Sequence, residues 1–235
     1  MNSLRSRLSL SGVSALALLA ACAPDAPGPV WFPLRAGDVQ RYEVRYDSVP
    51  TRANETWTLR TQGPVQWNGE PHMLRHHSEG VAFYLRADAQ GVRRVAHQTD
   101  LDREPLADDK PQWVLKAPYT QGTEWSTVTV PYLLMRKNEY PRELKRSHKV
   151  QMNWHINAVN LEVTLRSGQT FSPCLLVVGE AFLNLYTDPV NGFMDVPLVS
   201  REWYCQGHGL VKFSREETVS SGFMTGGSLS AELLP

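Results

Sequence analysis

The sequence predicts an all-β protein of mainly antiparallel strands, arranged as a single curved sheet, a half-barrel or a barrel with few short helices. Three observations support this prediction. Apolar and polar residues alternate along many short segments, as in strands with one face toward solvent. Turn-forming residues separate these segments at short intervals. Stretches with helical periodicity are scarce. From the alternating segments and the turns between them we expect roughly ten to twelve strands.

The alternation begins after Gly37, where Tyr42, Val44 and Tyr46 would face one side of the sheet and charged residues the other. The same pattern recurs in four later segments, at Trp57/Leu59, Phe83/Leu85, Met152/Trp154/Ile156 and Leu161/Val163/Leu165. Strands of this kind are typical of antiparallel sheets that are covered on one face.

Turn signals lie between the expected strands, at WNGE (67–70), DAQG (88–91), VN (159–160) and RSGQ (166–169). The clearest predicted hairpin covers residues 81–98, with 81–87 and 92–97 as its arms. The segment CLLVVG (174–179) is apolar on both faces, which predicts a central, covered strand.

Two segments do not fit the strand pattern. Residues 135–148 have a helical composition, but Pro141 interrupts them, so we expect a loop or one or two turns. Residues 99–111 predict a polar connection rich in carboxylates, which are numerous enough for a calcium site. The ligand spacing and glycine of a calcium loop are missing, so we favour a solvated loop. The carboxylates are Asp100, Asp102, Glu104, Asp108 and Asp109.

The amino terminus has the layout of a secretion signal. Arg5 and Arg7 precede a run of small and apolar residues (8–21), and the first acidic residue is Asp25. The run is shorter than the roughly 20 apolar residues of a membrane-spanning helix. We therefore expect a cleaved signal rather than a permanent anchor helix.

The end of this run, Leu19-Ala20-Ala21-Cys22, resembles the lipobox of bacterial lipoproteins. The resemblance implies that acyl chains such as palmitate are attached to Cys22 and that the chain is cleaved before it. Each buried methylene contributes about 0.8 kcal/mol, so several chains hold a protein firmly on a membrane. The alternative is an ordinary signal peptide with Cys22 present by chance.

The chain then divides into a signal peptide (1–21), a proline-rich tether (22–30) and one antiparallel β domain (31–235). Residue 23 is Ala rather than Asp. By resemblance to the sorting rule of enterobacterial lipoproteins, this favours the outer membrane, with the domain facing the periplasm, over the inner membrane.

Cys174 and Cys205 are the two remaining cysteines, and both lie in predicted strands. In an oxidising compartment such a pair tends to form a disulfide, which would stabilise the fold by roughly 3 to 4 kcal/mol on the chain-entropy model. Two separate buried thiols are the alternative, because the sequence does not show whether the Cα atoms approach closely enough.

The sequence excludes several function classes. Lys plus Arg and Asp plus Glu both number 24, so we expect no nucleic acid partner. The motifs of serine hydrolases, zinc proteases, phosphate loops and dinucleotide-binding folds are missing. We predict no catalytic residue, no cofactor and no metal ligand, although a metal site assembled from distant strands stays open. The histidines, which include no His-x-His pair, are His72, His76, His77, His97, His148, His155 and His208.

Three segments resemble a group of uncharacterised bacterial lipoproteins: WFPLRAGDVQRYEV (31–44), GQTFSPCLLV (168–177) and EWYCQGHGLVKFSRE (202–216). The matching residues are Phe32, Pro33, Leu34, Gly37, Tyr42, Phe171, Cys174, Leu175, Trp203, Tyr204, Gly207, Gly209, Val211 and Lys212. The chain departs from the group at Gln40 or Arg41, where Trp is common, and at His208, where Val is common. The resemblance implies a curved sheet similar to that of lipoprotein carriers, whose half-closed barrel holds acyl chains.

The aromatic residues leave two interpretations open. The chain has seven Trp, eight Tyr and seven Phe, and their rings would either line a cavity for an apolar ligand or fill the core. The lipobox, the sheet and the missing motifs favour a non-catalytic, membrane-anchored cell-envelope lipoprotein that binds a hydrophobic ligand or an envelope protein. The alternative is a structural or assembly subunit without a ligand, and a hydrolase with an unmarked site is the least favoured hypothesis.

Overall fold

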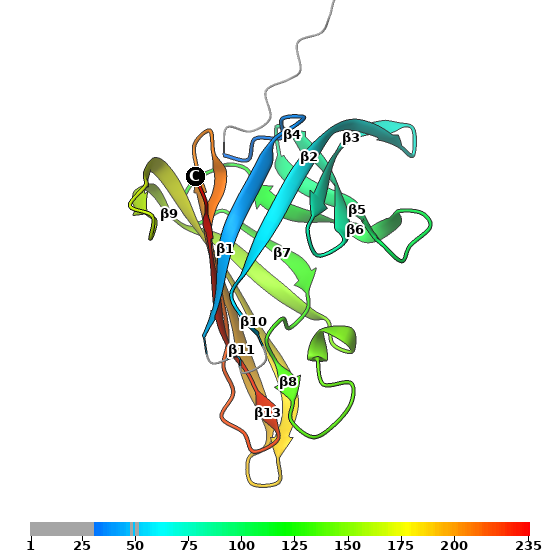
Figure 1. Ribbon diagram of the computed structural model, residues 1–235, viewed down its shortest axis with the longest axis vertical. Helices are drawn as coiled ribbons and strands as arrows, with labels where there is room; N and C mark the ends of the chain where they lie inside the picture. The colour runs from blue at the N-terminus through cyan, green and yellow to red at the C-terminus, as the bar shows by residue number, and fades with distance from the viewer. Residues whose placement is uncertain (1–30, 48, 50–51) are drawn as a thin grey trace, which may run out of the picture.

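A computed structural model describes residues 31–47, 49 and 52–235 (Figure 1). Twelve strands form one antiparallel sheet that is nearly closed into a barrel, which confirms the predicted fold class. The strands are β1 (Val39–Asp47), β2 (Glu55–Trp67), β3 (Glu70–His77), β4 (Val81–Asp88), β5 (Gly91–Thr99), β6 (Leu106–Lys116), β7 (Glu124–Thr129), β9 (Val150–Thr164), β10 (Thr170–Asp188), β11 (Gly192–Cys205), β12 (Gly209–Glu217) and β14 (Gly227–Leu233). A two-stranded sheet pairs β8 (Met135–Arg136) with β13 (Met224–Thr225), and a 3-10 helix, η1, covers Leu144–Arg146.

The order of strands across the large sheet is β6-β5-β4-β3-β2-β1-β14-β12-β11-β10-β9-β7. Most pairs join strands that are close in the chain. The pairing of β1 with β14 is the exception, and it joins the first half of the sheet to the second. The two ends of this order, β6 and β7, are consecutive in the chain and lie near each other across a seam (Figure 1).

The predicted alternation is confirmed in β1, where Tyr42 and Val44 are buried and Arg45 is exposed. The predicted hairpin over residues 81–98 is confirmed as the antiparallel pair β4 and β5. The segment 174–179 lies in β10, which pairs with β9 on one side and with β11 on the other. It is therefore the central strand that its apolar composition predicts.

The prediction of a connection over residues 99–111 was wrong in its extent, because β6 begins at Leu106 and pairs with β5. Arg94 in β5 donates to both carboxylate oxygens of Asp108 at 2.8 Å. This charged pair holds a polar segment in an edge strand, where side chains and one row of backbone groups face water. Residues 135–148 contain β8 and the single turn η1 and no longer helix, as predicted.

The three segments that carry the lipoprotein resemblance meet at one end of the sheet. The ring of Phe32, from the first segment, lies 6.0 Å from the ring of Tyr204 in the third. The ring of Phe171, from the second segment, contacts His208 in the third, with centroids 4.9 Å apart. The three segments therefore pack against one another at this end of the domain.

A disulfide also holds this end of the sheet. Cys174 in β10 and Cys205 in β11 are direct partners across the two strands, with Cα atoms 4.0 Å apart, and their sulfur atoms are bonded. Gly207 and Gly209, in the turn that follows, have φ angles of 77° and 79°. Residues with a side chain rarely adopt this left-handed backbone conformation, so the turn favours glycine at both positions.

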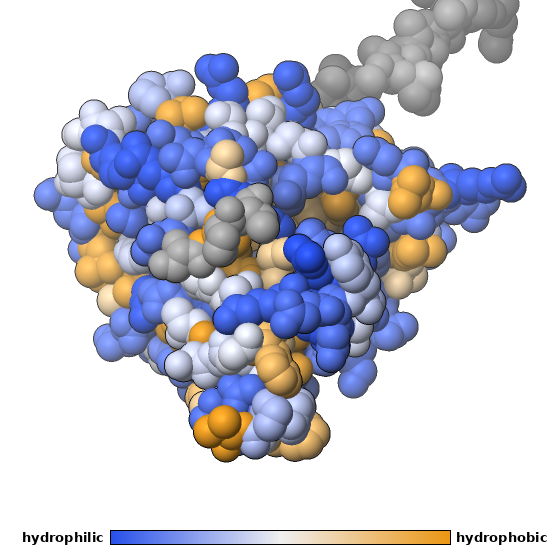
Figure 2. All heavy atoms as spheres, turned by 60° about the horizontal axis from the view of Figure 1, so that its bottom comes forward, coloured by the Kyte–Doolittle hydropathy of each residue, from blue (hydrophilic) through white to orange (hydrophobic). Residues whose placement is uncertain are grey.

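The other end of the domain is a long hairpin in which β10 and β11 extend beyond the neighbouring strands (Figure 1). Hydrophobic atoms lie at the surface of this projecting end, beside hydrophilic ones (Figure 2). Phe182, Val190 and Phe193 are 66%, 92% and 71% exposed. The hairpin thus carries large apolar side chains that no described residue covers.

Candidate functional site

The concave face of the sheet borders a partly open cavity of about 330 Å³, here called the interior cavity. Its lining comes from both halves of the sheet, from β1 to β4 and from β7, β9, β11, β12 and β14. Small-molecule sites are mostly apolar and have volumes of roughly 300 to 1,000 Å³. The aromatic side chains that line the interior cavity are Tyr42, Trp57, Phe83, Tyr132, Trp154 and Phe213.

Trp154 illustrates how the strands position these rings. Its Nε1 donates to Thr127 Oγ1 in the adjacent strand β7 at 2.8 Å. On its other side, Trp154 lies opposite Gly179 in β10. A Cβ atom at Gly179 would lie 2.5 Å from a ring carbon of Trp154, so the glycine leaves room for the indole.

Glu202 is a carboxylate in this aromatic lining. Burial raises its pKa from 4.5 to about 7, although a hydrogen bond from Tyr204 and the charge of Arg215 act in the opposite direction. Tyr204 Oη donates to Glu202 Oε2 at 2.5 Å, and no other described side chain donates to this carboxylate. Near neutral pH, Glu202 can therefore either donate or accept a hydrogen bond.

His77 and Glu79 also line the cavity, next to Trp57. The rings of His77 and Trp57 lie edge to face, with centroids 5.2 Å apart. Burial lowers the pKa of His77, which outweighs the opposite effect of the Glu79 carboxylate. The imidazole is thus neutral near neutral pH, which suits an apolar lining.

The segment that follows β7 contributes Tyr132 to the cavity. The backbone N–H groups of Tyr132, Leu133 and Leu134 donate to the carboxylate of Glu217 at 2.9, 2.7 and 3.2 Å. Glu217 is fully buried, so these bonds tie the segment to β12. The position of Tyr132 thus depends on a carboxylate distant in sequence.

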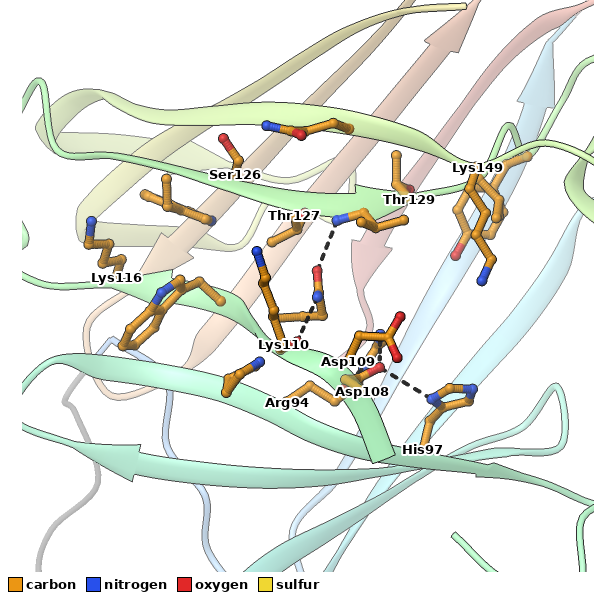
Figure 3. A pocket seen from close by; sticks show the side chains of 18 residues that line it. Arg94, His97, Asp108, Asp109, Lys110, Lys116, Ser126, Thr127, Thr129 and Lys149 are labelled. Carbon is orange, nitrogen blue, oxygen red and sulfur yellow. Dashed lines mark hydrogen bonds and ion pairs between the residues drawn. The ribbon is translucent and has the colours of Figure 1, made fainter. Parts of the chain in front are cut away.

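A second hollow, the seam groove, has a volume of about 860 Å³ and lies along the seam between β6 and β7 (Figure 3). Two side chains bridge the seam. The backbone N–H of Val128 donates to Gln112 Oε1 at 2.8 Å, and Lys116 Nζ donates to the backbone oxygen of Glu124 at 3.0 Å. The groove is lined by residues 108–113 and 125–130 together with Arg94, His97, Lys116, Tyr132, Lys149 and Gln151.

The seam groove has an excess of positive charge. It is lined by Arg94, three lysines and two carboxylates, and Arg94 is paired with Asp108 at 2.8 Å. This leaves Lys110, Lys116 and Lys149 against Asp109, and none of the three lysines forms an ion pair with a described carboxylate. His97 lies beside Asp108, with Nδ1 3.4 Å from Oδ1.

The interior cavity and the seam groove adjoin, because Thr129 and Tyr132 line both. Figure 3 places Thr129 toward the end of the groove that holds Lys149, with Lys116 at the opposite end. Tyr132 is 42% exposed, which fits a side chain that borders two open spaces. Thr129 and Tyr132 therefore lie at the border between an apolar hollow and a basic one.

The predicted site residues lie elsewhere. Cys22, the signal peptide (1–21) and the tether (22–30) are outside the described residues. Cys174 and Cys205 form the disulfide at one end of the sheet and line neither hollow. Of the five carboxylates expected between residues 99 and 111, Asp108 and Asp109 line the seam groove. In the described part of the chain, no three His, Cys, Asp or Glu residues are grouped to hold a metal ion.

Sequence reasoning missed Glu202 and Arg215, although a signal was present. Both are charged residues in phase with the buried side chains of an alternating strand: Glu202 lies two positions before the buried Tyr204, and Arg215 lies two positions after Phe213. A charge at an inward-facing position is unusual unless it is paired or functional. No comparable pattern in the sequence indicated that β6 pairs with β5.

No helix in the described part of the chain has the length and apolar character that spanning a bilayer requires. Comparison with known protein families found no match, and comparison with curated proteins found none either.

Two solved structures are similar. One is an uncharacterised protein from Bacteroides fragilis, assigned as exported and described as having a YmcC-like fold; it is 13% identical, with a TM-score of 0.36, and the match covers 87% of this chain and 98% of that one. The other, assigned as a lipoprotein from Parabacteroides distasonis, is 11% identical, with a TM-score of 0.36, and the match covers 89% and 100%. TM-scores this low support no inference about this chain.

Proposed function

We propose that the protein is a non-catalytic cell-envelope lipoprotein that is anchored to the outer membrane through acylated Cys22 and holds a hydrophobic ligand in its interior cavity. The lipobox-like segment supports the anchor. The observation that carries ligand binding is the space of about 330 Å³ beside six aromatic side chains. Rings that only filled a core would leave few voids larger than a water molecule, because protein interiors are closely packed.

The size of the cavity limits the ligand. A methylene group occupies about the volume of one water, roughly 30 Å³, so the space accommodates about ten methylenes. Transfer of such a chain from water contributes about 8 kcal/mol before the entropy cost of binding. We therefore expect one short alkyl chain or a compact apolar molecule, rather than a lipid with two long chains.

A binding titration tests this proposal. The mature chain, residues 22–235, with Cys22→Ser carries neither the apolar signal segment nor an acylation site, so it can be studied without detergent. Decanol, a neutral ten-carbon chain, should bind with a change in tryptophan fluorescence, because Trp57 and Trp154 line the cavity. Calorimetry should give the affinity.

Leu59→Trp provides the critical comparison, because Leu59 lines the cavity and a larger ring there would occupy it. We expect decanol to bind about tenfold more weakly to this variant. Leu161→Trp is the matched control, at a half-buried leucine packed beside the disulfide. Equal affinities of the two variants for decanol, or no decanol binding by the Cys22→Ser protein without either substitution, would overturn the proposal.

The anchor has a separate test. Intact-mass analysis of protein extracted from membranes should give a chain that begins at Cys22 and carries acyl chains. A mature chain with a free thiol at Cys22, or one that begins at another residue, would contradict the lipid anchor and leave the cavity proposal standing.

Binding of an envelope protein is a second candidate, favoured by the exposed apolar side chains of the β10–β11 hairpin. Phe182 and Phe193 are 66% and 71% exposed, and exposed apolar surface can mark a contact with another protein. If a partner covers this hairpin, Phe182→Ser with Phe193→Ser should abolish a complex recovered by crosslinking and leave decanol binding unchanged. Recovery of the same complex would exclude the hairpin as the contact.

A further inference from the structure

We propose that the natural ligand is a single-chain amphiphile with an anionic head group, whose chain lies in the interior cavity and whose carboxylate or phosphate lies in the seam groove near Lys110 and Lys149. This inference rests on the proposed function and assigns the class of ligand. It also assigns the seam groove as the head-group site.

The first argument is continuity. Thr129 and Tyr132 border both hollows, so a molecule that fills the apolar cavity can extend past them into the groove. Figure 3 places Thr129, in β7, near Lys149, which directly precedes the paired strand β9, while Lys110 projects from the opposite wall, β6. A head group that emerges at Thr129 would thus reach a lysine from each wall.

The second argument is charge. Lys110 and Lys149 form no ion pair with any carboxylate in the described part of the chain, and both are exposed. Asp108 is already neutralised by Arg94, with two hydrogen bonds of 2.8 Å. The local potential is therefore positive, which attracts an anion and repels a cation.

Arg215 is excluded as the head-group site. It lines the interior cavity, but it is 2% exposed and its guanidinium is occupied by Glu217 and by Ser200. The cavity also contains the carboxylates of Glu79 and Glu202 beside aromatic rings, an arrangement that could instead hold a cation. The experiment therefore includes a cationic amphiphile.

Four amphiphiles with ten-carbon chains test the inference on the mature chain, residues 22–235, with Cys22→Ser: decanoate, decyl phosphate, decanol and decyltrimethylammonium. The charged amphiphiles are titrated below their micelle concentrations and decanol below its solubility limit, at a pH where both acids are ionised. We expect decanoate and decyl phosphate to bind about tenfold more tightly than decanol, and the cation to bind most weakly. The ratio of the two acids distinguishes a carboxylate from a phosphate head group.

The double variant Lys110→Gln with Lys149→Gln should bind both acids no more tightly than decanol, while decanol binding is unchanged. Unchanged decanol binding also shows that the variant is folded. The matched control, Lys137→Gln with Lys145→Gln, removes the same charge outside the groove and should keep the preference for anions.

The outcomes separate the two proposals. If decanol binds and the head group makes no difference, or the cation binds most tightly, the anionic head-group site is wrong and the cavity proposal stands. The same holds if the groove variant keeps its preference for anions. If none of the four amphiphiles binds, both proposals are wrong.

Discussion

Arg215 and Glu217, two positions apart on β12, form an ion pair inside the protein, with Nε and Oε1 2.8 Å apart and side chains only 2% and 0% exposed. Each of the two charged groups also has hydrogen-bond partners outside the pair. Arg215 Nη1 also donates to Ser200 Oγ at 2.9 Å, and Glu217 accepts the three backbone N–H groups after β7. A buried pair of this kind is tolerated because further hydrogen bonds compensate both charges.

Glu217→Gln should lower the free energy of unfolding by about 3 to 5 kcal/mol, because it leaves the guanidinium of Arg215 buried without its counter-charge. Urea denaturation measures the loss. Glu216→Gln is the adjacent control: Glu216 pairs with Arg201 at the surface, with a side chain 49% exposed, and its loss should change stability by about 1 kcal/mol or less. Similar losses in the two variants would show that the buried pair has no special role.

Gly179→Ala should destabilise the protein by about 1 to 3 kcal/mol and shift the fluorescence of Trp154. The added Cβ would lie 2.5 Å from the indole, so the ring must move. Gly63→Ala is the control, since the nearest atom to its added Cβ is 3.5 Å away, an ordinary contact. An unperturbed fluorescence spectrum in Gly179→Ala would mean that Trp154 does not lie against β10.

The stability of the protein should decrease as pH rises from about 4.5 to about 7, through Glu202. The pKa of Glu202 is raised to about 7 in the folded protein. Between the two values the folded state therefore binds more protons than the unfolded state, and the free energy of unfolding falls. The contribution of Glu202 to the free energy of unfolding is about 3 kcal/mol; it is fully present below pH 4.5 and lost above pH 7.

Other groups titrate in the same range, so the measurement is the difference between the protein and its Glu202→Gln variant. Urea denaturation at a series of pH values should show the protein losing stability relative to the variant as pH rises. A constant difference across this range would mean that Glu202 has an ordinary pKa.

Removing the disulfide with Cys174→Ala and Cys205→Ala should lower the free energy of unfolding by about 3 to 4 kcal/mol, because the bond closes a loop over a sequence separation of 31 residues. A reducing agent should have the same effect on the unaltered protein. The double variant should not respond to the reductant, and a response there would assign the effect to another group.

Several elements were predictable because their cause is local. The alternation around Tyr42 and Val44 reflects the period of a strand, and the turn at 88–91 is recognisable from its residue types. The apolar segment in β10 indicates a covered strand for the same reason. Each of these depends on residues a few positions apart.

The site depends on contacts that have no local signature. Thr129 and Tyr132 border both hollows only because the sheet curls until β7 approaches β6. Asp108 lies in a segment whose composition predicts a connection, because Arg94, the partner that holds it in a strand, is 14 residues away in the chain. The raised pKa of Glu202 likewise comes from burial by several strands.

The amino-acid sequence by itself determined that this protein is a sheet of antiparallel strands, because side-chain alternation and turn propensity act over a few residues. It also contains the lipobox-like segment that ends at Cys22. Only the tertiary structure decided that β1 pairs with β14, that the sheet curls around a cavity and that charged residues gather along the seam. These features arise from packing between residues far apart in the chain, where no short pattern records which surfaces will meet.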